Sequence, residues 1–156
     1  MSKYTFGIKS ADSYLLSLSE AYRQFRSDDL DANKALDCAM RAWHISEWIY
    51  KEFNLEATQG TLQQYQKRLA SAHDFLAFMH DVANGLKHCT LSQPLSSVDD
   101  SGTHLGDFSN DFDFSFDVSC LVLKLEDDTE RIFILELEKA IEHWRAYLDG
   151  LRTQQS

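Results

Sequence analysis

The sequence of 156 residues contains little proline, glycine or cysteine. One Pro and six Gly exclude a collagen-like or low-complexity chain. The three Cys form neither an even set nor a CxxC motif, which argues against a disulfide scaffold or a zinc ribbon and favours a reducing compartment. No apolar run reaches the length of a membrane span, and the first residues lack the pattern of a signal peptide. We therefore expect a single cytoplasmic domain over 1–156, which the length also favours.

Positive charge is also scarce, and it is unevenly distributed. Residues 1–92 carry ten Lys or Arg against eleven Asp or Glu, whereas residues 93–156 carry five against fourteen. The net charge of −10 argues against simple polyanion binding by the whole molecule. The nearly neutral first part can still hold a local phosphate site, and the acidic part helps to keep a small protein soluble.

Apolar residues recur at helical spacing through the first ninety residues. They predict four helices, over about 11–27, 31–54, 61–72 and 73–88. The second of these is apolar around more than half of its circumference, so we expect it at the centre of a helical bundle. Its polar strip holds Asp37, Arg41, His44 and Lys51, with Trp48 beside it.

The pattern changes after residue 89. Residues 90–111 are rich in Ser, Asp, Gly and Thr and predict an acidic loop. Strict alternation from Phe112 predicts a strand, and residues 131–136 predict its returning partner. A last helix follows over about 137–151. The predicted fold is mainly α, with four to five helices in all. Its parts are a bundle core over 1–89, the acidic loop, and a segment over 112–156 that holds a β-hairpin (about 112–136) and the C-terminal helix.

The segment FMHDVANGLKH, residues 78–88, carries the most specific pattern in the chain. Asn84 and His88 stand four positions apart in it. This arrangement resembles the signature of the HEPN superfamily, helical proteins common in bacterial toxin–antitoxin and antiphage systems. Active members have an Arg directly before the Asn, and that position is Ala83 here. The resemblance implies metal-independent RNA cleavage or, because the arginine is missing, RNA binding alone.

The resemblance also implies roles for particular side chains. His88 would move protons during attack of the 2′-hydroxyl on the adjacent phosphate, a contribution of about 10²–10⁴-fold. A guanidinium would stabilise the developing charge, and Arg41 is placed to supply it if its strip faces Asn84. The candidate catalytic residues are therefore His88, Asn84, Arg41 and His44. The candidate nucleic-acid-binding residues are Lys87, Arg41 and Arg68.

Each of these residues also has a purely structural interpretation. Asp37 and Arg41 stand at i,i+4 and can pair to fix the register of a helix. A histidine near a helix C-terminus, such as His88, is favoured by the helix dipole alone. Arg68 and His73 form a literal Arg-x4-His, but chance supplies about one such match in a chain of this composition.

Two functions from different classes remain open. The first is a small HEPN-like bacterial or mobile-element protein of defence or toxin–antitoxin systems, a homodimer that binds RNA or a nucleotide; as an enzyme it would be a metal-independent ribonuclease. The second is a non-enzymatic module that binds a cognate protein partner through the acidic segment 107–118. Its contact residues would be Phe112, Phe114, Phe116 and Asp113. Neither function requires a metal, a cofactor or a membrane.

Overall fold

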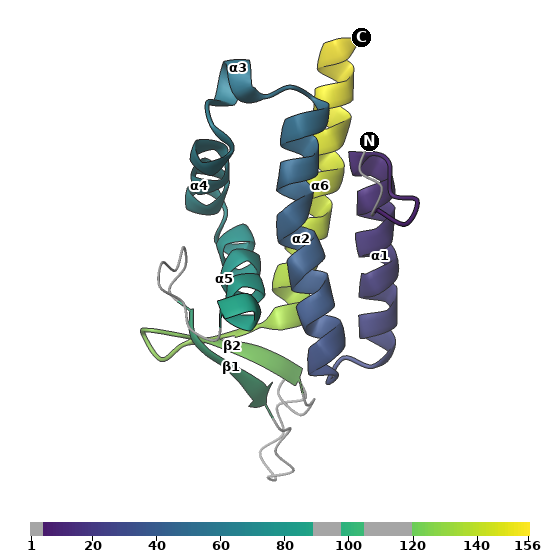
Figure 1. Cartoon of the computed structure of the whole chain (residues 1–156). Helices are drawn as coiled ribbons and strands as arrows, with labels where there is room; N and C mark the ends of the chain where they lie inside the picture. Colours follow the sequence, from purple (N-terminus) through teal and green to yellow (C-terminus); the bar gives the residue numbers. More distant parts are fainter. Residues whose placement is uncertain (1–4, 89–97, 105–119) are drawn as a thin grey trace.

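The computed structural model describes residues 5–88, 98–104 and 120–156, with the backbone alone at 86–88 and over most of 98–104 (Figure 1). These residues form helices α1 (Ala11–Ser27), α2 (Ala32–Glu52), α3 (Glu56–Gln59), α4 (Leu62–Ala72), α5 (Asp74–His88) and α6 (Phe133–Gln155), and strands β1 (Val98–His104), β2 (Cys120–Leu125) and β3 (Glu130–Ile132). The predicted fold class, mainly α with a β-hairpin before the last helix, is confirmed. Among the helices described, none is both long and apolar enough to cross a membrane.

Three helices, α1, α2 and α4, begin at side chains that accept hydrogen bonds from free backbone N–H groups. Ser10 starts α1 in a reciprocal capping box with the third residue of the helix, and Thr61 starts α4 in the same way. Asp31 accepts from two N–H groups in the first turn of α2. Beyond the end of α2, Asn54 adopts φ +52°, a conformation that Asn tolerates better than most residues. The four predicted helices therefore lie within two residues of their expected bounds.

α2 lies at the centre of the bundle, in contact with α1, α4, α5 and α6, as its apolar circumference predicts (Figure 1). Ile45 and Ile49 on this helix are completely buried. The indole of Trp144 on α6 is equally enclosed, and its Nε1 donates to the backbone oxygen of Ala42 over 2.8 Å. A buried ring that also makes a directional bond fixes both the distance and the rotation of α6 relative to α2.

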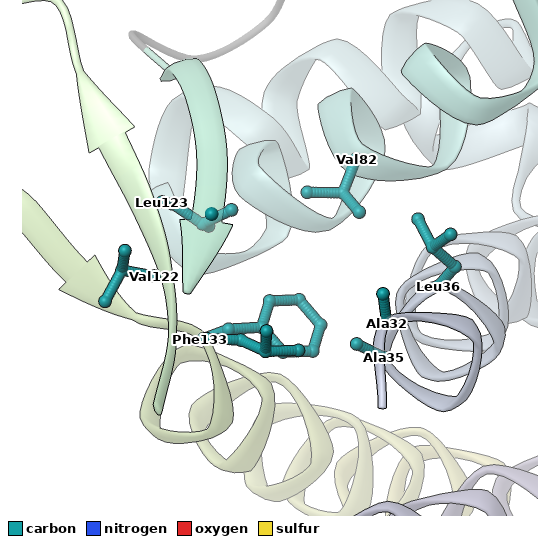
Figure 2. Close-up of a pocket in the computed structure, with 9 residues that line it drawn as sticks. Ala32, Ala35, Leu36, Val82, Val122, Leu123 and Phe133 are labelled. Carbon is teal, nitrogen blue, oxygen red and sulfur yellow. The ribbon is translucent and has the colours of Figure 1, made fainter. Parts of the chain in front are cut away.

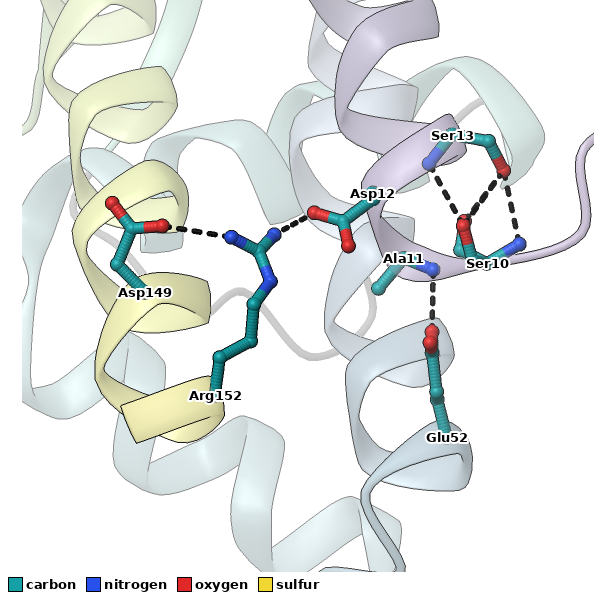
Figure 3. Close-up of polar contacts among 7 residues, drawn as sticks. All are labelled: Ser10, Ala11, Asp12, Ser13, Glu52, Asp149 and Arg152. Carbon is teal, nitrogen blue, oxygen red and sulfur yellow. Dashed lines mark hydrogen bonds and ion pairs between the residues drawn. The ribbon is translucent and has the colours of Figure 1, made fainter. Parts of the chain in front are cut away.

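A polar junction closes the end of the bundle at which α1 begins and both α2 and α6 end (Figure 3). The Glu52 carboxylate accepts from the backbone N–H of Ala11 over 2.5 Å, which satisfies a donor in the first turn of α1. Arg152 on α6 binds both Asp12 and Asp149, the latter over 2.8 Å. These ion pairs are largely exposed, so they contribute little to stability and mainly fix where the helix ends meet.

A three-stranded antiparallel sheet, in the order β1-β2-β3, lies at the opposite end of the bundle (Figure 1). β2 and β3 form the predicted hairpin around a turn that includes Asp128. Leu123 and Leu125 of β2 belong to the same hydrophobic core as the helices. The sheet therefore covers one end of the bundle instead of forming a domain of its own.

The first strand corrects the prediction of a loop over 90–111. Residues 98–104 pair with β2 from Val98 opposite Leu125 to His104 opposite Cys120, with a shift of register between Val98 and Asp100. Their sequence, VDDSGTH, has no apolar alternation that reveals a strand. Pairing with the backbone of an apolar neighbour, rather than a pattern of its own, makes this segment a strand.

The returning strand is also shorter than predicted. It ends at Ile132, and Phe133 begins α6, so the predicted strand residues 133–136 are helical. Phe133, Leu137 and Ala140 are all buried, which is helical spacing and overrides the apparent alternation before it. The early part of the other predicted strand, residues 112–119, lies outside the described residues.

Two histidines hold the joint between α4 and α5 against α6. His73 ends α4, and its carbonyl accepts from the first turn of α5. Its ring centroid lies 4.4 Å from that of His143 on α6. Nε2 of His143 is buried without a hydrogen-bond partner, and the ring is surrounded by Phe75, Trp144 and Tyr147. Burial, with a smaller effect of the neighbouring His73, lowers the pKa of His143 from 6.5 to about 4.

We expect this corner to make the fold sensitive to acid. Because the folded state favours the neutral imidazole, its stabilising effect is complete above pH 6.5 and is lost as the pH falls towards 4. In His143→Phe the ring is kept and the titrating group is removed. The loss of unfolding free energy over this pH range should then be smaller by about 2 kcal/mol. Urea unfolding of both proteins at the two pH limits measures the difference, and an equal loss in both would contradict the expectation.

Candidate functional site

The half of α5 that carries the HEPN-like motif lies at the sheet end of the bundle (Figure 1). Asn84 is partly exposed on this half, whereas Ala83 is only 4% exposed. Lys87 and His88 end the helix, and their side chains lie outside the described part of the chain. The described part of the site therefore consists of polar residues about one turn earlier in α5.

Three polar side chains of α5 form a hydrogen-bonded chain. Nδ1 of His80 lies 2.6 Å from Oδ1 of Asp81, and its Nε2 lies 2.6 Å from Nδ2 of Asn84. Asp81 is 1% exposed, and the side chain of His80 is 12% exposed. A carboxylate enclosed in this way needs such partners, because burial of an uncompensated charge is costly. His80 is not among the predicted catalytic or binding residues, although the sequence shows His80 next to Asp81 and four positions before Asn84.

The geometry assigns a donor and an acceptor to each bond of this chain. An amide nitrogen can only donate, so Asn84 Nδ2 donates to Nε2 of His80. The ring proton then lies on Nδ1, which donates to the Asp81 carboxylate. Both ring nitrogens are thereby occupied. Asp81 orients His80, and His80 orients the Asn84 amide, so the chain supports an amide.

α2 supplies the wall behind this chain. Trp43, which is 4% exposed, meets the His80 ring edge-on with centroids 4.9 Å apart. α2 and α5 therefore pack together, as expected for a site shared between them. His44 follows Trp43 directly, is exposed, and emerges about 100° further around the helix.

Arg41 is directed away from this wall. Its Nε donates to Asp37 over 2.9 Å, and its Nη1 donates to the hydroxyl of Ser17 on α1 over 3.1 Å. Arg41 lies about 160° around α2 from Trp43, the residue that contacts α5. The structure thus places the guanidinium at the contact between α1 and α2, and does not bring it to Asn84.

Arg68 and His73, the literal Arg-x4-His pair, belong to the corners around α4. Arg68 donates to the backbone oxygen of Gln59 at the end of α3 and to its side-chain oxygen, the latter over 3.0 Å. His73 packs on His143, as described above. Both residues therefore serve the connections between helices in this structure.

An apolar pocket of about 200 Å³ lies between α2, α5, the sheet and the start of α6 (Figure 2). Among the described residues its lining includes Leu36, Val82 and Phe133 and no charged or polar side chain. Ligand sites usually combine an apolar wall with a few polar groups that orient the ligand. This pocket lacks those groups, so the chemistry of the site lies on the polar side of α5.

The remaining candidates are the predicted partner contacts, possible metal ligands and a cysteine nucleophile. The predicted partner contacts Phe112, Phe114, Phe116 and Asp113 lie outside the described residues. In the part of the chain that the structure describes, no three His, Cys, Asp or Glu side chains are grouped to hold a metal. Cys38 is buried, and burial raises the pKa of its thiol to about 12, which makes it a poor nucleophile.

Ala83 gives a direct test of how the motif sits in the fold. Ala83, directly before Asn84, is enclosed in the core, so Ala83→Arg should lower the unfolding free energy by roughly 3 kcal/mol or more. His44→Arg, at an exposed position on α2, introduces the same side chain and should change stability by less than about 1 kcal/mol. Thermal and urea unfolding compare the two variants. Normal stability of Ala83→Arg would mean that this face of α5 opens outward.

Comparison with known proteins assigns no family to the chain. No protein-family model, curated protein sequence or solved structure matches it. Any functional interpretation therefore depends on the contacts that the side chains of α5 make.

Proposed function

We propose that this chain is a HEPN-like RNA-binding protein that binds without cleaving, in bacterial or mobile-element defence or toxin–antitoxin systems. The observation that carries the proposal is the chain Asp81–His80–Asn84, which orients an asparagine amide on the helix with the HEPN-like spacing. A side chain held by two successive hydrogen bonds is suited to recognition, because little conformational entropy is lost when it binds.

Binding without cleavage is favoured by where the arginines lie. The usual arginine position is the buried Ala83, and Arg41 and Arg68 are both engaged by other residues. His80 uses both ring nitrogens to bind Asp81 and Asn84, and the amide N–H that faces its Nε2 is not acidic, so in this structure His80 serves to orient Asn84. Phosphorane charge would then lack the fork of donors that stabilises it in active members.

The charge distribution supports a small contact. The first 92 residues are nearly neutral, and the strongly acidic part follows them. Only a few phosphates can be neutralised by such a surface, so the affinity should depend weakly on salt, with a slope of about −0.7 per phosphate contacted. Lys87, one turn beyond Asn84 on α5, is the cation nearest to the motif in sequence.

RNA binding can be measured by fluorescence anisotropy with a short single-stranded RNA at low salt. Lys87→Ala should weaken binding several-fold and reduce the salt slope by about 0.7, because one phosphate contact is lost. Arg68→Ala removes the same charge from the molecule but from a residue held by Gln59, so it should leave binding unchanged. Gel electrophoresis should show that the same RNA stays intact after incubation with the wild type or with either variant.

Three results of these binding measurements would count against the proposal or change it. No RNA binding by the wild type at low salt would contradict the proposal. Loss of a protein partner on deletion of 107–118, in the same preparation, would then favour the interaction module. Equal weakening by Lys87→Ala and Arg68→Ala would mean that overall charge, and not the end of α5, governs binding.

We also propose a homodimer, since sites in the HEPN-like proteins that this chain resembles form where two copies meet. A contact through the exposed face of α2 beside α5 would bring two copies of His44 together. His44→Glu should therefore shift the protein towards a monomer, because two carboxylates would face each other. Lys67→Glu on the exposed face of α4 is the control and should leave the dimer intact. Light scattering at micromolar concentration measures both, and a monomeric wild type would contradict the proposal.

A further inference from the structure

We infer that Asn84 forms hydrogen bonds with the edge of a nucleobase, preferably adenine, and does not bind a phosphate. The inference rests on the proposed RNA binding and specifies what this part of the site recognises. It follows from which donors and acceptors are bonded within the chain Asp81–His80–Asn84 and which remain available to a ligand.

The Asn84 amide has two donors and one acceptor oxygen. One N–H is donated to Nε2 of His80 over 2.6 Å. That bond restricts the orientation of the amide and leaves one N–H and the carbonyl oxygen for a ligand. A donor and an acceptor are therefore presented together, in an orientation set by the protein before any ligand arrives.

The remaining groups of Asn84 are open to a ligand. The structure gives this amide no partner other than His80 among the described residues. The buried side-chain atoms without a partner in the described part of the chain are the Tyr65 hydroxyl and Nε2 of His143. The Asn84 oxygen is not among them, and the residue is partly exposed, which fits an amide that a ligand can approach.

A phosphate does not match this pair of groups. Phosphate oxygens accept hydrogen bonds only, so the Asn84 carbonyl would face them without a donor and at an electrostatic cost. This mismatch makes an anion the less favourable occupant at this position.

An adenine edge matches the pair of groups on Asn84. The exocyclic N6 amino group donates and N7 accepts, and asparagine binds this edge with two bonds at once. Recognition of RNA generally targets single strands, whose bases can turn out and expose such edges to side chains. Contacts to the phosphates would then come from basic side chains, because base edges and backbone are generally recognised by different groups.

The test compares three oligomers of equal length: oligoadenylate, oligouridylate and an abasic ribose-phosphate chain. Wild type should bind oligoadenylate about tenfold more tightly than the abasic chain, which corresponds to one good pair of base contacts. Asn84→Ala should lose this preference while affinity for the abasic chain stays unchanged. Asn33→Ala, an exposed asparagine in the first turn of α2, is the matched control and should retain the preference.

His80→Phe tests the support of the amide. Phenylalanine keeps a ring against Trp43 but cannot accept from Asn84, so the base preference should fall while binding of the abasic chain persists. A merely structural role of His80 would lower affinity for all three oligomers equally, and that result would overturn the positioning role.

The outcomes separate this inference from the function on which it rests. Equal binding of the wild type to all three oligomers would overturn base reading and leave RNA binding in place. No binding of any oligomer would contradict RNA binding, and base reading with it. The wild-type comparison needs no variant, so the result stands even if a substitution on α5 impairs folding.

Discussion

The burial of Trp144 against α2 is the contact on which the rest of the architecture depends. α6 follows the three strands in the chain and packs against α2. Its indole is fully enclosed and bonded to the backbone of Ala42, 102 positions away. With α6 fixed there, His143 one residue earlier meets His73, and the joint before α5 is held in place. The orientation of α5 thus follows from a contact made far from its own polar residues.

A second constraint acts within α5 itself. Asp81 is a carboxylate at a buried position, and a buried carboxylate must be hydrogen-bonded or neutralised. His80 meets this need from the adjacent position and passes the orientation on to Asn84. Trp43 closes the space beside the ring. The polar residues of the site are therefore held by the same packing that forms the core, which explains how a partly exposed amide can be well oriented.

Prediction from sequence succeeded where periodicity was long and failed where pairing decided the structure. α1, α2, α4 and α5 each carry several turns of apolar spacing with a cap at the start, so their bounds were predictable. β1 has no pattern of its own and exists because β2 lies beside it. Arg41 was correctly placed on a polar strip of α2, but a strip does not say which neighbour it faces. Ser17 of α1 binds it here, and only the packed bundle determines that choice.

The contacts between α1 and α6 have a consequence for how the chain folds during synthesis. Tyr22 donates to Glu138 over 2.5 Å, and Arg152 binds Asp12 near the start of the first helix. Such contacts join nearly the whole length of the described chain, whereas most helix-to-helix contacts in small bundles are local in sequence. The apolar face of α1 must therefore wait, uncovered on that side, until the last helix has left the ribosome. A nascent chain in this state exposes apolar surface of the kind that chaperones cover.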